Sequence, residues 1–257
     1  MNRSLKSIGV LLLVWLAVAP ALAKKGKTYI VTVGISEYRE VQNRLKSPAF
    51  NAETIVNVFQ SAGQTEARLI TNSNATPAKV LQAMNELFSK AGKDDAIVFF
   101  YSGHGSPGHF DSYDGNLMHK DVLQVMKNSR AGRKMMFVEA CFSGSMRRET
   151  RSGREKLLMK KMGTSTMNSS KKLGIMMFLS SLDNETSMEY TAWKNGLFTA
   201  HLQFALKGGA DKNEDKVITA RELYDFVTPA VERVSKQQQH PVMWGNFDDN
   251  MPVISWE

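Results

Sequence analysis

The sequence predicts an α/β fold with a mostly parallel sheet that helices cover on both faces. Two observations support this prediction. Short, uninterrupted apolar runs alternate with helical patterns along the chain, and several of these runs are rich in β-branched residues. Strands buried on both faces of a parallel sheet are continuously apolar, because neither face meets water. In such sheets ligands bind beyond the carboxyl ends of the strands, so the polar residues that follow the strands are the candidates for function.

The elements follow one another in a regular order. Strands are expected at 28–35, 67–70, 95–101, 134–139 and 174–180, with a last edge strand at 242–244. Helices are expected at 49–62, 77–91, 120–129, 196–206 and 219–234. The second of these helices has a clear start, because Thr76 suits the N-cap and Pro77 suits the first turn. No internal repeat or domain linker interrupts the pattern.

The first 23 residues have the features of an export signal. Arg3 and Lys6 give a positive start, an apolar run spans 8–18, and Ala21-Leu22-Ala23 has the small-x-small pattern that signal peptidase recognises. The run is short for a membrane span, although a retained anchor helix is the alternative. We therefore expect a signal peptide at 1–23 and one domain at 24–257, exported to the periplasm or secreted, with no stable membrane insertion after cleavage.

The basic charge of the chain is concentrated in one segment. The formal net charge is +8, of which Arg3 and Lys6 contribute two. Much of the excess lies in residues 146–173, a polar stretch that is long for a simple connection and is expected to be a flexible loop. It carries nine cationic residues: Arg147, Arg148, Arg151, Arg154, Lys156, Lys160, Lys161, Lys171 and Lys172. No aromatic residues are interleaved with them, so nucleic-acid binding is not expected.

Cys141 is the only cysteine, and it follows the strand expected at 134–139. No disulfide within the chain can form, so the thiol is either a buried inert group or a reactive one. A neighbouring imidazole that takes its proton would make it a nucleophile. The residues around it are small, and its exposed backbone amide could donate to the oxyanion that forms when a carbonyl is attacked.

His104 lies in Ser102-Gly-His-Gly-Ser106, just after the strand expected at 95–101. Glycines on both sides let the backbone bend and leave the ring open to a substrate. A lone histidine is more often a solvated loop residue, but the strand-end position beside two glycines favours a general base that is paired with Cys141. His109, His119, His201 and His240 have no comparable setting and are taken as structural.

The blocks Tyr-Ser-Gly-His-Gly and Glu-Ala-Cys-Phe-Ser-Gly-Ser resemble the two catalytic blocks of the caspase-like cysteine peptidases, which include caspases, metacaspases and legumains. The sequence around Cys141 is similar to that of legumain. The segments 180–189, 195–199 and 241–246 are more similar to bacterial caspases and metacaspases. The spacing of 141 − 104 = 37 residues is shorter than the caspase value of about 50. The resemblance implies a three-layer α/β/α sandwich with a mostly parallel six-stranded sheet. It also implies a His104–Cys141 dyad, with the amides of Gly105 and Cys141 as oxyanion donors.

The resemblance also implies where the substrate binds. In metacaspases and legumain an acidic residue two positions before the cysteine reaches the pocket for the side chain before the cut, and here this residue is Glu139. Asp183 best matches a second acid, and the segment from Ser180 would form the pocket wall. Two carboxylates in a narrow pocket favour arginine or lysine. An ordinary strand-end charge at Glu139, a turn residue at Asp183, and an asparagine preference like that of legumain are the alternatives.

Residues 211–222 resemble a calcium-binding EF-hand loop. Asp211, Asn213, Asp215, Thr219 and Glu222 occupy ligand positions, but the sixth position carries Lys216 instead of glycine. A polar turn in which Thr219 caps the next helix explains the same residues. Calcium is therefore an open alternative outside the catalytic site, and no cofactor is expected to be required for the reaction.

These inferences together predict an exported cysteine endopeptidase that acts on protein or peptide substrates. The basic segment at 146–173 offers bonds that such an enzyme could cut in its own chain, after lysine or arginine. A transpeptidase of the same fold and a non-catalytic binding or regulatory protein are the alternatives. The sequence gives no indication of the oligomeric state.

Overall fold

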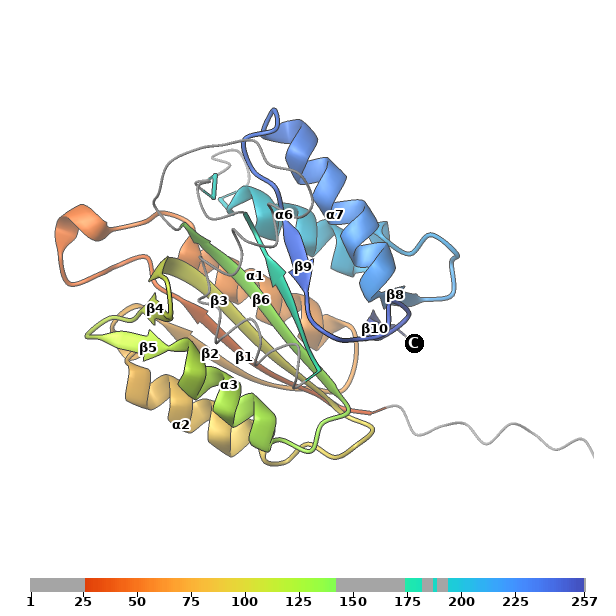
Figure 1. The fold of residues 1–257 in the computed structure, drawn as a ribbon, viewed down its shortest axis with the longest axis horizontal. Helices are drawn as coiled ribbons and strands as arrows, with labels where there is room; N and C mark the ends of the chain where they lie inside the picture. Colours follow the sequence, from red (N-terminus) through yellow and green to blue (C-terminus); the bar gives the residue numbers. More distant parts are fainter. Residues whose placement is uncertain (1–25, 142–173, 182–186, 189–193, 257) are drawn as a thin grey trace, which may run out of the picture.

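A computed structural model describes residues 26–141, 174–181, 187–188 and 194–256, with Cys141 described by its backbone alone. The central sheet has six strands in the order β2-β1-β3-β6-β7-β9, of which the first five are parallel and β9 is antiparallel to β7 (Figure 1). The strands are β1 Thr28–Gly34, β2 Thr65–Thr71, β3 Ala96–Ser106, β6 Arg133–Cys141, β7 Ile175–Leu179 and β9 Val242–Trp244. The predicted α/β/α sandwich with a mostly parallel six-stranded sheet is confirmed.

Helices cover both faces of this sheet. Helices α2 Pro77–Phe88 and α3 His119–Asn128 lie on one face. Helices α1 Pro48–Ser61, α6 Leu197–Phe204 and α7 Ala220–Val234 lie on the other. Thr76 caps α2 by accepting a hydrogen bond from the amide of Lys79, as its sequence position predicted. No helix within the described ranges is long and apolar enough to cross a membrane.

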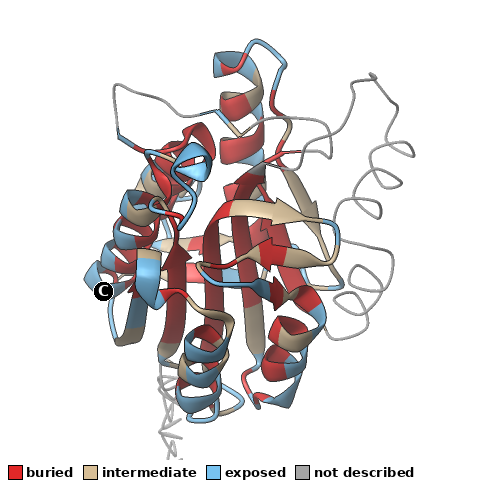
Figure 2. Ribbon diagram, turned by 90° about the vertical axis from the view of Figure 1, so that its left-hand side faces the viewer, coloured by how far each residue is buried: buried red, intermediate tan, exposed pale blue. Residues whose placement is uncertain are grey.

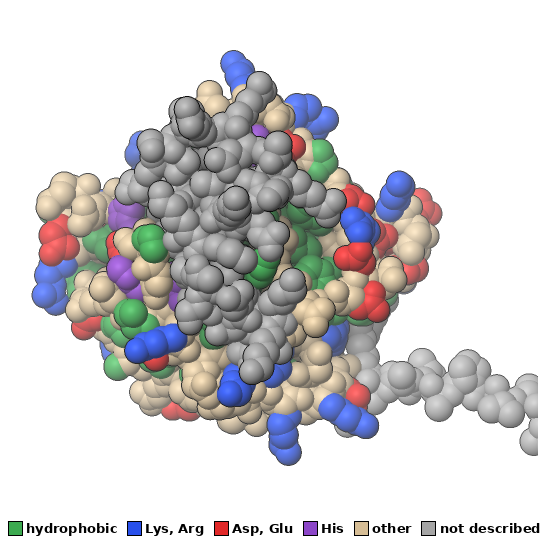
Figure 3. All heavy atoms as spheres, in the orientation of Figure 1, with side chains coloured by type: hydrophobic (Ala, Val, Ile, Leu, Met, Phe, Trp, Pro, Cys, Tyr) green, Lys and Arg blue, Asp and Glu red, His purple; other side chains and the backbone are tan. Residues whose placement is uncertain are grey.

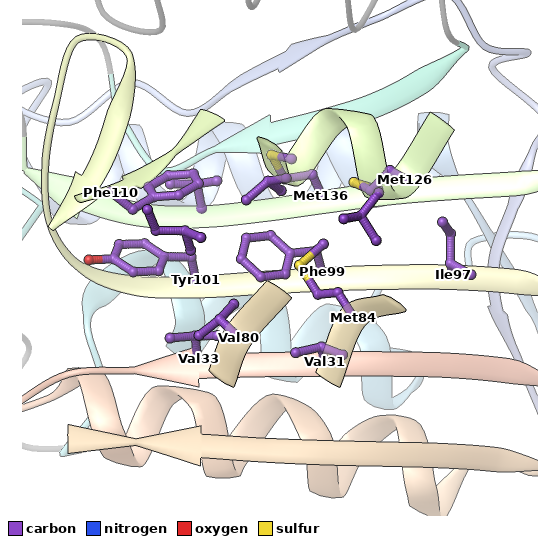
Figure 4. Packing of buried hydrophobic residues seen from close by; sticks show 14 of the residues in the cluster. Val31, Val33, Val80, Met84, Ile97, Phe99, Tyr101, Phe110, Met126 and Met136 are labelled. Carbon is purple, nitrogen blue, oxygen red and sulfur yellow. The ribbon is translucent and has the colours of Figure 1, made fainter. Parts of the chain in front are cut away.

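Alternate strand residues supply two separate cores, one on each face. Val31, Phe99 and Met136 pack against α2 and α3, whereas their neighbours Ile30 and Phe137 pack against α1, α6 and α7. Figure 4 shows part of the first core, and Figure 2 shows the buried strands between helices whose outer sides are exposed. Burial on both faces explains why these strands are continuously apolar.

Two strands run further than the sequence indicated. The sequence placed their ends at Tyr101 and Glu139, whereas β3 continues to Ser106 and β6 to Cys141. The polar residues beyond the apolar runs remain paired with each other, and the end of β3 also pairs with β4 His109–Asp111. Strand β4 in turn pairs with β5 Asn116–Met118, forming a small ribbon at the carboxyl edge of the sheet.

Several short elements complete the described chain. Strands β8 Val217–Thr219 and β10 Pro252–Ser255 form a separate antiparallel pair, and a π-helical turn at Ala205–Gly209 follows α6. Short 3-10 turns lie at Val41–Asn43 and Asn72–Asn74. The turn at Val41–Asn43 lies in the connection between β1 and α1, beside the end of β3, and one of its carbonyls contributes to the candidate site described below.

Candidate active site

The sheet places His104 directly beside Cys141. Strands β3 and β6 are paired in parallel register from Ala96 and Arg133 to His104 and Cys141, so these last two residues are Cα partners. Neighbouring strands lie about 4.8 Å apart. The backbone therefore brings the two predicted residues together at the carboxyl edge of the sheet, and their catalytic roles stay predictions.

Two tyrosine hydroxyls fix the backbone of His104. Its amide donates a 2.7 Å hydrogen bond to the Tyr38 hydroxyl, and its carbonyl oxygen accepts a 2.5 Å hydrogen bond from the Tyr101 hydroxyl. Gly103 lies between them, where a Cβ atom would come within 2.5 Å of the Tyr38 hydroxyl and 2.6 Å of the Tyr101 hydroxyl. Only glycine fits at this position, which explains one of the two glycines that flank His104 in the sequence.

The imidazole of His104 is oriented by a backbone carbonyl. Its Nε2 lies 2.8 Å from the carbonyl oxygen of Asn43, and its ring centroid lies 4.9 Å from that of Tyr38. A carbonyl oxygen can only accept, so Nε2 carries the proton in this contact and Nδ1 keeps the lone pair that a general base needs. A partner that fixes the tautomer of a base is a recurring part of nucleophilic catalytic sites. Sequence reasoning missed Asn43, because a backbone carbonyl has no sequence signature.

The Tyr101 hydroxyl keeps its proton and so remains a hydrogen-bond donor. It is fully buried, and burial raises the pKa of its phenol well above the usual value, with Tyr38 acting in the same direction. The hydroxyl therefore stays protonated, and it lies close to the carbonyl oxygens of both His104 and Asp111. It ties the end of β3 to the β4 strand.

Glu139 is buried, and its carboxylate accepts hydrogen bonds from two helices. The residue is 4% exposed, and its oxygens accept hydrogen bonds from Asn51 Nδ2 at 3.0 Å and from the amides of Phe198 at 3.1 Å and Thr199 at 3.3 Å. The Thr199 hydroxyl donates as well. Gly196 passes so close that a Cβ there would lie 2.2 Å from Oε1 of Glu139. The carboxylate thus sits at the amino end of α6, where a negative charge is favourable.

A hollow of about 40 Å³ lies beside Glu139. We call it the inner hollow, and its wall includes Leu45, Asn51, Gly103, Glu139, Ser187 and Gly196. Ser180 is fully buried behind this wall, where its hydroxyl lies 2.6 Å from that of Ser187. Of the residues predicted to bind substrate, Glu139 therefore lines the hollow, Ser180 supports it through Ser187, and Asp183 lies outside the described residues. Their roles in substrate binding stay predictions.

A second, larger hollow of about 420 Å³ has His104 itself in its wall. We call it the outer hollow, and it is lined by Tyr38, Arg39, Glu40, Asn43, His104, Asp111, Ser112, Tyr113, Asp114, Gly115 and Asn116. Both partners of the His104–Asn43 hydrogen bond belong to its wall. In Figure 3, histidine and acidic side chains lie together on the side of the molecule where Figure 1 shows β4 and β5.

The other predicted site residues are placed as follows. Gly105 follows His104 in β3 and pairs with Phe110 of β4, so its backbone lies at the edge where an oxyanion donor is expected. Its donor role stays a prediction. The proposed signal peptide and the basic segment at 146–173 lie outside the described residues.

In the loop that resembles an EF-hand, the acidic side chains bond to nearby backbone amides. Oxygens of Asp211 accept from the amides of Asp215 and Lys216, and Glu222 accepts from the amide of Thr219. Thr219 caps α7 in return, as the alternative interpretation of this sequence expected. Within the described residues, no group of three or more His, Cys, Asp or Glu is placed to hold a metal ion. Calcium binding here stays a prediction.

Comparisons with known proteins identify the family. A profile described as the caspase domain matches residues 27–251. The chain belongs to the caspase-domain family. The family supports cysteine peptidase activity in general. The resemblance inferred from the two motifs is confirmed.

Solved structures share the caspase-like fold at low sequence identity. Caspase-1 from Spodoptera frugiperda is 11% identical with a TM-score of 0.63, over 91% of this chain and 92% of that chain. Protein GSU0716 from Geobacter sulfurreducens is 18% identical with a TM-score of 0.64, over 90% of this chain and all of that chain. A curated relative, the hemoglobinase of Schistosoma japonicum, is 36% identical over 61 residues, which are 22% of this chain and 14% of that protein.

Proposed function

We propose that this caspase-domain protein is an exported cysteine endopeptidase in which Cys141 is the nucleophile and His104 the general base. The observation that carries the proposal is the register of β3 and β6, which makes these two residues direct neighbours. The Asn43 carbonyl on Nε2 of His104 supports it, because it leaves Nδ1 free to accept a proton.

The reaction follows from these positions. His104 takes the thiol proton of Cys141 as sulfur attacks the peptide carbonyl, and the amides of Gly105 and Cys141 stabilise the oxyanion. The C–N bond then breaks, and His104 returns the proton to the leaving amine. Water, activated by the same imidazole, cleaves the thioester, which releases the carboxylic acid and restores the thiol.

The preferred residue before the cut is proposed to be arginine or lysine. The support is the negative charge of Glu139 in the wall of the inner hollow. Its Oε2 already accepts hydrogen bonds from Asn51 and Thr199, so we expect the charge, more than a new bidentate pair, to attract the cation. A preference for asparagine is the alternative, because the sequence around Cys141 is similar to that of legumain.

Peptide substrates that carry a fluorogenic coumarin amide test both points. The protein should hydrolyse those ending in arginine or lysine faster than those ending in asparagine or aspartate, and Cys141→Ala should hydrolyse none. A clear preference for asparagine would contradict the proposed cleavage after arginine or lysine and support the legumain-like alternative. Products joined to an added peptide amine, in place of free acids, would reveal transpeptidation. A folded protein that processes no substrate would favour the non-catalytic alternative.

Self-processing and export are further parts of the proposal. The support for self-processing is the run of nine lysines and arginines between 146 and 173, directly after Cys141 in the sequence. Mass spectrometry of the purified wild type should find cuts there that are missing from Cys141→Ala. Equal cutting of the two proteins would assign the cleavage to another protease. Export predicts a mature protein that begins at Lys24, and an uncut amino terminus in the exported protein would contradict it.

A further inference from the structure

Two hollows adjoin the end of β3, and a peptide substrate has a side chain on each side of its scissile bond. Gly103 belongs to the wall of the inner hollow and His104 to the wall of the outer hollow. We propose that the outer hollow binds the side chain of the residue after the cut, and that it prefers a cationic one. This inference rests on the proposed function, in which the side chain before the cut points towards Glu139 in the wall of the inner hollow, a space of about 40 Å³ that receives only its charged end.

The chemistry of the proposed reaction places the residue after the cut at this hollow. His104 delivers a proton to the leaving amine, so the two must come within hydrogen-bond distance. The α-carbon next to that amine carries the side chain in question. Because His104 forms part of the wall of the outer hollow, that side chain lies at its opening. At about 420 Å³ the hollow has room for a long side chain such as lysine or arginine.

The charges around the outer hollow are mainly negative. Its wall contains three carboxylates, from Glu40, Asp111 and Asp114, against the single guanidinium of Arg39. This is a local surplus of two negative charges in a chain whose formal net charge is +8. Fields from like charges around a concave surface raise the local concentration of an oppositely charged ligand. The hollow therefore favours a cation over an anion.

The partners of these groups show which of them can pair with a substrate. Asp111 lies 3.2 Å from Nε2 of His109, so its carboxylate is already in use. The guanidinium of Arg39 lies 5.8 Å from the centre of the Tyr113 ring. Within the part of the chain that the structure describes, Glu40 and Asp114 form no side-chain hydrogen bond or ion pair. These two carboxylates can pair with an incoming cation without giving up any contact of the fold.

This specificity has a consequence for the chain itself. The basic segment contains three pairs of adjacent cations: Arg147–Arg148, Lys160–Lys161 and Lys171–Lys172. If both hollows accept cations, the bond inside each pair meets both preferences, whereas the isolated Arg151, Arg154 and Lys156 meet one. Self-cleavage is then expected within the pairs.

The test uses a matched set of internally quenched peptides that differ only in the residue after a fixed arginine: lysine, glutamine or glutamate. Their kcat/KM values are compared for wild type, for the double variant Glu40→Gln with Asp114→Asn, and for Glu53→Gln. Glu53 serves as the matched control. It is an exposed carboxylate on α1, which lies on the opposite face of the sheet from α2 and α3. Each rate is divided by the rate of the same protein on an arginine coumarin amide, which has no residue after the cut.

Wild type and Glu53→Gln should prefer lysine over glutamate by roughly tenfold, and raising the salt concentration should reduce this ratio. The double variant should lower the ratio to about twofold, because two of the three carboxylates are gone. Equal rates for lysine and glutamate in a wild type that hydrolyses the coumarin amide would overturn the inference and leave the peptidase standing. A wild type that hydrolyses neither kind of substrate would overturn both.

Discussion

The inner and the outer hollow both have carboxylates in their walls, but these carboxylates differ in burial and in hydrogen bonding. Glu139 in the inner hollow is 4% exposed and accepts hydrogen bonds from α1 and from the first turn of α6. Glu40 and Asp114 in the outer hollow are exposed and form no such bonds with the described residues. Glu139 therefore links α1 to α6 beside the site, whereas Glu40 and Asp114 face solvent.

This difference separates stability from substrate choice. Removing a buried acceptor leaves its donors without partners, which costs free energy of unfolding before any substrate is present. Removing an exposed carboxylate changes stability little, because water replaces its contacts. We therefore expect the loss of Glu139 to alter both stability and activity, and the loss of Glu40 or Asp114 to alter only the choice of substrate.

The largest expected effect concerns the proposed dyad of His104 and Cys141. Cys141→Ala should abolish peptide cleavage, and His104→Ala should lower kcat/KM by a similar factor, on the order of 10⁴ or more, because residues that act as one unit are not additive. Steady-state kinetics on a coumarin amide measures this, and thermal unfolding checks that both variants fold. Near-normal turnover by either variant would contradict the assignment of these two residues as the dyad.

The next effect concerns the tyrosine that fixes His104. Tyr101→Phe removes the donor to the His104 carbonyl, so it should lower kcat by about 10- to 100-fold while KM changes little. Tyr29→Phe, at the amino-terminal end of β1, is the matched control and should keep kcat. If both variants had the same kcat as wild type, the imidazole would not depend on this hydroxyl.

Glu139→Gln tests the comparison of the hollows directly. It should lower the free energy of unfolding by about 2 kcal/mol, because the amide that replaces one oxygen presents donors to donors. It should also weaken cleavage after arginine more than cleavage after neutral residues. Glu40→Gln should leave the unfolding temperature unchanged. Denaturant titrations of the two variants provide the measurement, and an equal loss of stability in both would erase the distinction.

The pH dependence of stability gives a smaller effect. The pKa of Tyr101 is raised in the folded protein, because burial disfavours the phenolate. Above about pH 10, where an exposed tyrosine ionises, the unfolded chain loses a proton that the folded chain keeps, so stability falls as pH rises. Thermal unfolding between pH 8 and 11 should show a shallower decline for Tyr101→Phe than for wild type. Parallel declines would show that Tyr101 does not contribute.

The smallest expected effect is that of metal removal. The acidic loop at 211–222 leads into α7, apart from both hollows, and its carboxylates bond to backbone amides. A chelator should therefore leave kcat/KM unchanged, and added calcium that occupies the loop should alter only the unfolding temperature. Activity that a chelator abolishes and calcium restores would link this loop to the site.

The sequence predicted the main sheet well because its strands are long and apolar. Burial on both faces left a continuous run such as 96–101, which has few other interpretations. The three-residue strands β4 and β5 were missed because they are short and partly polar. The pair β8 and β10 was missed because its strands lie far apart in the chain and show no local signal.

The candidate site was predictable only where side chains form a motif. His104 and Cys141 stand in recognisable blocks, and the register of two strands brings them together. The carbonyl of Asn43 and the amides of Phe198 and Thr199 are backbone groups, which any residue could supply. The state of Glu139 depends on α6, about 60 positions further along the chain, so its buried hydrogen bonds could not be inferred from its own neighbourhood.

The most direct test of the central claim is labelling of the single cysteine. A peptidyl acyloxymethyl ketone with a terminal arginine reacts with thiols that an enzyme activates, and Cys141 is the only thiol in the chain, so the mass shift has one origin. We predict that wild type is labelled to one equivalent and that His104→Ala is labelled at least 100-fold more slowly, since the imidazole activates the thiol. Equal labelling rates in the two proteins would contradict the assignment of His104 and Cys141 as the catalytic pair.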